Sequence, residues 1–484
     1  MGVRRALFWA TIGRNLVMLI NLAVAIIVGR LIGPSAFGVS VLGGSALIVA
    51  EALREIGGGA YLIQEKELTA RQIRTSITAS VLISIAISVL LYSSAGPIAD
   101  FYNLPEVGHY IRIAALGYLL GPFIFPVFAL MSREMAFGSF AFVNASMAVV
   151  GGLTSFWLAK LGFGYISLAW ATVAASVAGS VLCFLLRSDR SIYLPSLSEW
   201  RSVIGFGAFD GATALVAAIG EYAPYIVIGR VLDAANVGIA QRAVLLAAFP
   251  ERVILAGVGA TALPVFSRSV REKSDTGAVY LNVLELISAV HWPCLLLLGT
   301  VSTPLVGIVL GPQWIEVAPL VRILCLAAAF SFPLALQYPV LVAVGAVRSL
   351  PPLVAGQVIL NTAVTAFAAS HGLFSIAWCL VGIIPLNALI AVAVVRRYLD
   401  FCWSDFFGAL RKSVVLTIFS GSFPIWVVLT RGHLGDVSIE TGLLGVLLSI
   451  VGWGIGLLVT RHPLRLELVR AAKIIKENVD AWVH

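Results

Sequence analysis

Fourteen long apolar segments, separated by short stretches rich in proline, glycine or charge, make up most of this chain. A helix needs about 20 apolar residues to cross a lipid bilayer, so each segment is long enough for one membrane span. The pattern predicts an all-α polytopic membrane protein of about 14 transmembrane helices. The expected spans are 7–29, 37–60, 74–95, 109–131, 138–159, 163–186, 203–228, 237–262, 279–301, 318–344, 352–370, 373–395, 413–430 and 441–460.

One stretch of the sequence returns 200 residues later. Seven of 32 positions are identical between residues 29–60 and 229–260 without a gap. The identical pairs are Gly29 and Gly229, Arg30 and Arg230, Gly38 and Gly238, Glu51 and Glu251, Gly57 and Gly257, Gly59 and Gly259, and Ala60 and Ala260. Six predicted spans separate the copies, and six is even, so both copies enter the membrane from the same side. This predicts two parallel six-helix lobes, 1–190 and 200–398, followed by two unpaired helices in 409–460.

Basic residues between the predicted spans fall mainly on alternate loops. If the N-terminus is cytoplasmic, cytoplasmic segments hold 22 of the 32 lysines and arginines, and outer loops hold four. By the positive-inside rule, this bias places both termini in the cytoplasm. After the last span, residues 463–484 put apolar and basic positions on opposite helical faces. That pattern predicts an amphipathic helix on the cytoplasmic membrane surface.

Composition supports the membrane class. Of all residues, 60% are hydrophobic and only 12% are charged, and the mean hydropathy is +0.99. A soluble domain carries about 25% charged residues. The net charge of +8 does not indicate nucleic acid binding, because the basic residues flank predicted spans. The five cysteines lie singly and predict neither a metal nor a redox site.

Ionisable residues inside the spans are the candidates for function, because a charged side chain at mid-bilayer costs about 2.5–3.5 kcal/mol. The candidate substrate-cavity arginines are Arg14, Arg54, Arg242, Arg112 and Arg322. The candidate acids for ion or proton coupling are Glu51, Glu55, Asp210, Glu221 and Glu251.

Structural alternatives apply to most of these residues. Arg112, Arg242 and Arg322 lie near span ends, from which their long side chains can reach the membrane surface. Arg54 follows Glu51 by three residues, a spacing that allows an ion pair on a helix. Each acid has the alternative of a buried carboxyl that is satisfied by neighbours.

The motifs that are missing from the sequence also restrict function. There is no G-x-x-x-x-G-K-[ST] phosphate-binding loop, no metal-ligand cluster and no catalytic triad spacing. Segments between spans are too short for an extramembrane catalytic domain. We therefore expect a protein that is not an enzyme and needs no cofactor. The acids inside the spans would allow coupling to H⁺ or Na⁺.

Short motifs along both lobes carry a family resemblance. They are GRLIGPSAFG at 29–38, GGGAYLIQEKELT at 57–69, FYNLP at 101–105, LMSREMAF at 130–137, LPVFSR at 263–268 and LGPQWIEVAPLVRIL at 310–324. The ordered set resembles the polysaccharide transporters, the Wzx-type O-antigen and exopolysaccharide flippase family, particularly its colanic-acid/succinoglycan exporter branch. That family belongs to the multidrug/oligosaccharidyl-lipid/polysaccharide exporter (MOP) superfamily.

The resemblance implies two lobes open like a V around a central cavity. It implies alternating-access transport of an undecaprenyl-diphosphate-linked oligosaccharide across the bacterial inner membrane. The partners expected are this lipid-linked oligosaccharide, membrane lipids and the polymerase or export machinery of polysaccharide biosynthesis. It transfers no catalytic residue. A cationic cavity suits a diphosphate because arginine binds phosphate bidentately.

Two other functions stay open at this point. A cavity lined mainly by acidic and aromatic residues would favour a drug or cation antiporter of the same superfamily. A membrane glycosyltransferase or polymerase would need larger outer loops with catalytic groups than this sequence contains.

Overall fold

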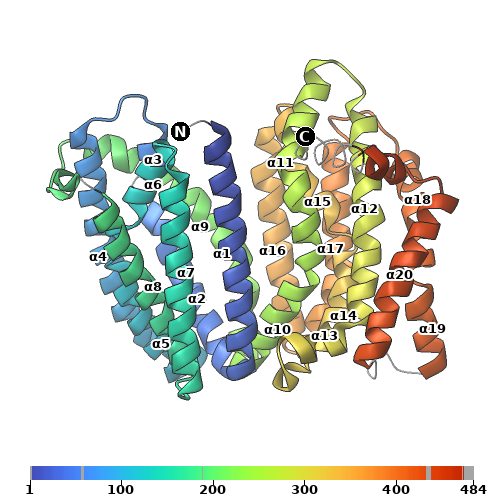
Figure 1. Cartoon of the computed structure of the whole chain (residues 1–484), viewed down its shortest axis with the longest axis horizontal. Coiled ribbons are helices and arrows are strands. Elements are labelled where there is room, and N and C mark those ends of the chain that lie inside the picture. Colours follow the sequence, from blue (N-terminus) through green and yellow to red (C-terminus); the bar gives the residue numbers. More distant parts are fainter. Residues whose placement is uncertain (1–2, 56–58, 188, 432–437, 471–472, 474–484) are drawn as a thin grey trace, which may run out of the picture. The chain divides into compact units, whose positions relative to one another are not determined.

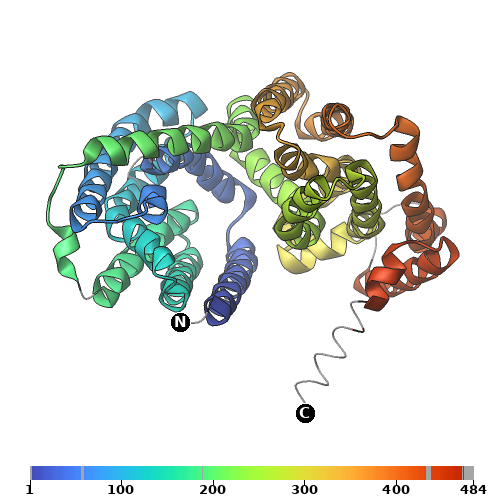
Figure 2. The ribbon, with the colours of Figure 1, turned by 90° about the horizontal axis from the view of Figure 1, so that it is seen from above.

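The computed structural model describes residues 3–55, 59–187, 189–431, 438–470 and 473. Within these ranges every regular element is a helix. Contacts divide the chain into two compact units, Met1–Ile239 with Val309–Gln313 and Ala240–Ile308 with Trp314–His484. Figure 1 shows the helices, and Figure 2 shows that most helices of each unit run along a common direction.

Among its described residues, the first unit contains α1 to α9 and two 3₁₀ turns, and α10 begins at its end. They are α1 (Val3–Leu31), α2 (Pro34–Glu55), α3 (Gly59–Gln64), α4 (Ala70–Tyr102), α5 (Pro105–Tyr118), η1 (Gly121–Phe123), α6 (Phe125–Arg133), α7 (Phe137–Lys160), α8 (Tyr165–Leu186), η2 (Arg190–Tyr193), α9 (Trp200–Val231) and α10 (Ala234–Ala247).

The second unit takes up the rest of α10 and the later helices. They are α11 (Phe249–Arg271), α12 (Thr276–Thr300), α13 (Ser302–Val309), η3 (Pro312–Trp314), α14 (Val317–Ala328), α15 (Phe332–Ala343), η4 (Val347–Ser349), α16 (Leu350–Ala369), α17 (Leu373–Val395), α18 (Trp403–Ser420), α19 (Ser422–Arg431) and α20 (Ile439–Val459).

Every predicted span coincides with a helix or with an interrupted pair of helices. Among the described residues, nine helices are long and apolar enough to cross a membrane, or ten if α14 and α15, which bend by 41°, form one span. The all-α, multi-pass membrane fold is therefore confirmed. The count of 14 and the lobe boundaries at 190 and 200 stay predictions. Of the predicted amphipathic tail, residues 464–470 are helical; 471–472 and 474–484 lie outside the described residues.

The repeated stretch has the same backbone in both copies. In the first, α1 ends at Leu31 and α2 begins at Pro34; in the second, α9 ends at Val231 and α10 begins at Ala234. Each boundary in the second copy lies 200 residues after its equivalent in the first. The repeat that the sequence predicts is present in the structure at this hairpin.

The two copies meet at their shared glycines, within the first unit. A Cβ on Gly38 would lie 1.6 Å from the carbonyl oxygen of Ala234, and a Cβ on Gly238 would lie 2.3 Å from that of Pro34. Pro34 and Ala234 are equivalent positions, so the contact has local two-fold pseudo-symmetry. Only glycine lets the first turns of α2 and α10 approach backbone to backbone.

Arg133, the last residue of α6, binds the end of α3. Its Nη1 donates to the carbonyl oxygen of Leu62 at 3.1 Å and to that of Glu65 at 2.5 Å, and its Nη2 donates to that of Lys66 at 3.1 Å. The last carbonyls of a helix have no partner within the helix. The arginine of the LMSREMAF motif therefore caps the short helix of the GGGAYLIQEKELT motif.

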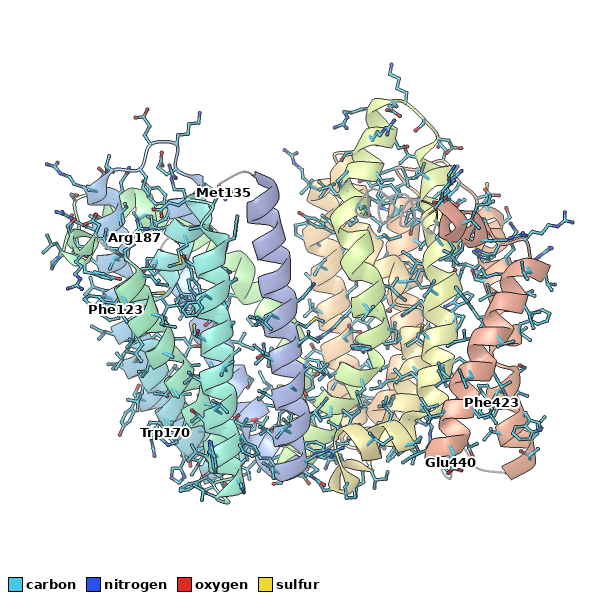
Figure 3. All side chains as sticks on the ribbon, viewed as in Figure 1. Phe123, Met135, Trp170, Arg187, Phe423 and Glu440 are labelled. Atoms are coloured by element: carbon cyan, nitrogen blue, oxygen red, sulfur yellow. The ribbon has the colours of Figure 1, made fainter. Side chains whose placement is uncertain are left out.

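The next residue of the same motif joins α6 to the segment after α8. Both carboxylate oxygens of Glu134 accept from Arg187, at 2.8 and 2.9 Å. Figure 3 shows Arg187 and Met135 toward one end of the first unit, with Trp170 toward the other. This pairing is bidentate, the geometry in which arginine binds carboxylate most strongly.

We expect the substitution Arg133→Lys to lower the stability of the protein by about 2–4 kcal/mol, because hydrogen bonds from a charged donor contribute about 1.5–3 kcal/mol each and lysine cannot reproduce the fork. Thermal unfolding in detergent, followed by size-exclusion chromatography, measures this loss. Arg71→Lys, at an exposed position near the start of α4, is the control. A melting temperature equal to that of the control would contradict the capping role.

The last three helices, α18 to α20, dock on α12 of the second unit. Ser288 Oγ donates to Ser413 Oγ at 2.8 Å, and Trp453 Nε1 donates to the carbonyl oxygen of Ala289 at 2.8 Å. Beyond α20, the buried His462 lies with Nε2 3.3 Å from Ser413 Oγ. The opposite end of this group holds Phe423 and Glu440, on α19 and α20 (Figure 3).

Acid should weaken this docking through His462. Burial, together with the nearby charge of Lys412, lowers the pKa of His462 to about 4, whereas an unfolded histidine titrates near pH 6.5. The unfolded chain therefore binds the proton more tightly, and the stability that is fully present above about pH 6.5 falls, by at most about 3 kcal/mol, as the pH drops to about 4. His462→Gln should flatten the dependence of melting temperature on pH over this range. An unchanged acid dependence in this variant would contradict the assignment.

Candidate functional site

In the first unit, an ion pair lies beside an interrupted helix. Arg54 and Glu51, one turn apart on α2, form a salt bridge, as their spacing predicts. The Arg54 guanidinium lies over the ring of Phe125, 3.3 Å from its centroid. The Tyr118 hydroxyl lies 3.4 Å from a carboxylate oxygen of Glu51. Tyr118 ends α5 and Phe125 begins α6, so the pair contacts the break in the predicted fourth span.

A small cavity adjoins this break. Its lining residues are Arg54, Gly59, Ser80, Ser84, Gly121, Pro122, Phe125 and Pro126. It measures about 30 Å³, which is room for roughly one water molecule. Prolines at the break remove backbone donors and prevent a continuous helix. Arg54, Ser80 and Ser84 give the cavity polar lining and Pro122, Phe125 and Pro126 give it apolar lining, but its volume is too small for a sugar.

The second copy of the repeat builds a related contact without the arginine. Glu251, in the first turn of α11, accepts a hydrogen bond from Ser331 Oγ at 2.5 Å. Ser331 lies between α14 and α15, which form the predicted tenth span, the counterpart of the fourth. Ile254 stands at the position equivalent to Arg54. In each unit, therefore, the repeated glutamate contacts the break in the same span of its own repeat.

The other described arginine candidates each contact a ring or a hydroxyl. Arg112 lies 5.9 Å from the ring centroid of Tyr92, Arg242 lies 5.7 Å from that of Trp314, and Nε of Arg322 donates to Ser302 Oγ at 3.1 Å. Arg242 is buried and Arg112 is exposed. Their role in a substrate cavity stays a prediction.

The structure describes few contacts for the four remaining candidate residues. Glu221 is exposed on α9. The side chains of Arg14, Glu55 and Asp210 lie outside the described residues, although their backbones belong to α1, α2 and α9. Their functional roles stay predictions.

Sequence reasoning missed Tyr118, Phe125 and Ser331, which bind the repeated glutamates or their ion pair. A signal for two of these positions was available. The dipeptide Phe-Pro begins α6 at 125–126 and α15 at 332–333, and it also occurs at 249–250, where it begins α11, and at 423–424. Interrupted helices at equivalent positions of two repeats are a pointer to the working part of a transporter.

A larger cavity of about 630 Å³ lies in the second unit, beside the α14/α15 break. Its lining residues are Trp292, Phe330, Phe332, Pro333, Pro385, Ala388, Leu389, Phe406, Phe407, Gly408, Leu410, Arg411 and Val414. The walls suit hydrocarbon rather than a hydrated sugar, because an apolar lining cannot replace the hydrogen bonds that a sugar makes with water.

Comparison with known sequences connects this geometry to a family. Residues 27–319 match the family described as "Polysaccharide biosynthesis protein". The teichuronic acid biosynthesis protein TuaB of Bacillus subtilis is 25% identical over 426 residues, which cover 84% of this chain and 86% of TuaB. The succinoglycan biosynthesis transport protein ExoT of Rhizobium meliloti is 25% identical over 349 residues, 71% of this chain and 69% of ExoT.

Solved structures share the fold. The lipid II flippase MurJ, in an inward closed conformation, matches with a TM-score of 0.68 and 13% identity over 93% of this chain and 98% of MurJ. An inward-facing multidrug resistance MATE family transporter of the MOP superfamily matches with a TM-score of 0.59 and 17% identity, over 80% of this chain and 97% of the transporter. At these identities the likeness concerns the fold alone.

Proposed function

This chain belongs to the polysaccharide biosynthesis protein family, and on that premise we propose that it moves an undecaprenyl-diphosphate-linked oligosaccharide across the bacterial inner membrane. Movement runs from the cytoplasmic to the periplasmic leaflet by alternating access, and both termini are cytoplasmic. The product serves the synthesis of exopolysaccharide, capsule or O-antigen. The polymerase or export machinery then acts on the translocated unit.

One observation carries this proposal. Relatives that match about 70% or more of this chain are named for different polymers, teichuronic acid and succinoglycan, and one of them is named as a transport protein. Proteins that are similar in sequence but are named for chemically different polymers have a step in common that does not depend on one sugar. Passage of a lipid-linked unit through the membrane is such a step.

The charged groups fit this role by their chemistry. Arg14, Arg54 and Arg242 would bind the diphosphate, with Arg112 and Arg322 as further cationic candidates, because a guanidinium matches two phosphate oxygens at once. The coupling ion would be H⁺ or Na⁺, and the candidate acids supply sites for it. Translocation makes and breaks no covalent bond in the cargo, so the proposal requires no catalytic residue.

The test uses the purified chain in liposomes that contain an undecaprenyl-diphosphate-linked oligosaccharide with an oxidisable terminal galactose. Galactose oxidase added outside labels only units in the outer leaflet. We expect the labelled fraction to rise with time in liposomes that contain the protein and not in protein-free liposomes, while the mass of the lipid-linked unit stays constant. An unchanged labelled fraction would overturn the proposal.

The same preparation separates the two alternatives. A glycosyltransferase or polymerase would change the mass of the lipid-linked unit. A drug or cation antiporter would exchange a fluorescent cationic dye against an ion gradient and leave the oligosaccharide in place.

A further inference from the structure

We propose that Glu251 and Ser331 form the proton-exchanging site that couples transport to a proton gradient, and that the equivalent Glu51, which is paired with Arg54, is not this site. The proposal rests on the proposed transport function. It assigns one of the two repeated glutamates to coupling from the contacts that distinguish them.

Ser331 holds Glu251 in a hydrogen bond that accommodates both protonation states. The hydroxyl oxygen of Ser331 lies 2.5 Å from Glu251 Oε2 and 2.9 Å from the carbonyl oxygen of Ala328. A hydroxyl has one proton to donate and two lone pairs to accept with. It donates to Glu251 when the carboxyl is ionised. When the carboxyl is protonated, the acid donates to the hydroxyl, whose own proton turns to Ala328.

This change of direction takes place at a joint between helices. Ala328 is the last residue of α14 and Ser331 directly precedes α15, and the two helices bend by 41°. Protonation of Glu251 therefore adds a hydrogen bond within the joint and weakens the link between the joint and α11. Trp292 of α12 fixes the other side of the joint, because its Nε1 donates to the carbonyl oxygen of Ala329 at 2.6 Å.

Glu51 differs because it has a fixed cationic partner. Arg54, one turn further along α2, forms a salt bridge with it. In the second copy, Ile254 replaces that arginine. Arg252, which follows Glu251, acts on its carboxylate electrostatically, but it is exposed, and consecutive residues of a helix point about 100° apart.

The helices that pack against α11 carry further titratable groups, of which Glu285 has a cationic partner and His291 has no hydrogen-bond partner on either ring nitrogen within the described residues. The helices α12 and α15 pack against α11. Their titratable residues are Tyr280, Glu285, His291, Cys294 and Tyr338. Glu285 lies 3.4 Å from Lys412 Nζ, and Tyr280 packs against Phe266 and Phe401. His291 lies against Phe332, with 6.0 Å between ring centroids, so it borders the joint from the α12 side.

A proton fits this site better than a sodium ion. One carboxylate and one hydroxyl are too few oxygen ligands for a hard cation, which takes about six. Within the described residues, no group of three or more His, Cys, Asp or Glu side chains is placed to hold a metal ion.

Infrared difference spectra of the full chain in liposomes, recorded between neutral and acidic pH, test the site without substrate. We expect a C=O stretching band of a protonated carboxylic acid that is present in the wild type and in the matched control Glu51→Gln, and is missing in Glu251→Gln. Ser331→Ala should shift the band to higher frequency, because it removes the hydrogen bond. A band that persists in Glu251→Gln, or one that disappears in Glu51→Gln, would overturn the assignment.

Two further measurements complete the test. Replacing potassium chloride by sodium chloride should leave the band unchanged; its loss in sodium alone would overturn the proton assignment in favour of a sodium site. In cells, Glu251→Gln should reduce polymer export by about tenfold or more at an unchanged protein level, within the 5–150-fold range typical of coupling between sites. Normal export would overturn the coupling role. Because the infrared result needs no oligosaccharide, a wrong substrate class would affect only the export measurement.

Discussion

The substitution Gly38→Ala is expected to remove folded protein from the membrane. The added Cβ would lie 1.6 Å from the carbonyl oxygen of Ala234, where ordinary contact begins at 3.4 Å. Both sides of the contact are helix backbone, which cannot rotate away as a side chain can. We expect a loss of more than about 4 kcal/mol, enough to exhaust much of the stability of a typical protein. The yield of monodisperse protein after detergent extraction measures it.

The chain supplies matched comparisons for this variant. Gly44 lies on the same helix, and a Cβ there would meet nothing within 4 Å. Gly44→Ala should therefore leave the yield unchanged, or stabilise α2 by up to about 1 kcal/mol because alanine favours the helix. Gly238→Ala should reproduce the loss, since this glycine makes the pseudo-symmetric contact with Pro34. Equal yields from Gly38→Ala and Gly44→Ala would contradict the close approach of the two copies.

The sequence predicted that Gly38 and Gly238 are equivalent, but not that they meet. Equivalence is visible in the spacing of a repeat, whereas the contact joins residues 200 positions apart, and hydrophobic periodicity carries no information about it. The positions at which helices begin and end were also only partly predictable from the sequence. The predicted span 413–430 begins in the structure at Trp403, because Asp405 accepts from the backbone amide of Cys402 at 2.7 Å and starts α18 in a polar segment. Hydropathy detects only the apolar part of such a helix.

In the candidate site, the contact within one helix was predictable from the sequence, whereas the contacts between helices were not. The Glu51–Arg54 pair was predictable from its three-residue spacing on one helix. Tyr118, Phe125 and Ser331 were not, because they reach the repeated glutamates or Arg54 from interrupted spans that were predicted as continuous. A proline within a transmembrane helix is often tolerated without a break, so the prolines at 122, 126 and 333 permitted the interruptions without predicting them.

Replacing Arg54 by alanine is expected to stop export while leaving most of the protein folded. The Arg54 side chain is 13% exposed, but its partner Glu51 is 48% exposed. Water can therefore solvate the glutamate that remains, and the loss of this pair should lower stability by only about 1 kcal/mol. A guanidinium that binds a diphosphate contributes more: removing one partner of a hydrogen-bonded charge pair costs about 2–5 kcal/mol. Export should fall by roughly 30-fold or more, which corresponds to about 2 kcal/mol.

Glu51→Gln decides whether Arg54 acts on the substrate or only on its neighbour. If the arginine serves a diphosphate, the glutamine variant frees it from its competing anion, and export should be retained or increased. If the ion pair serves only to hold α2 against the α5/α6 break, Glu51→Gln and Arg54→Ala should reduce export alike. Polymer export, the level of lipid-linked precursor and the amount of folded protein, measured together in the two variants, separate these outcomes. Equal losses in both would contradict the assignment of Arg54 to the substrate cavity.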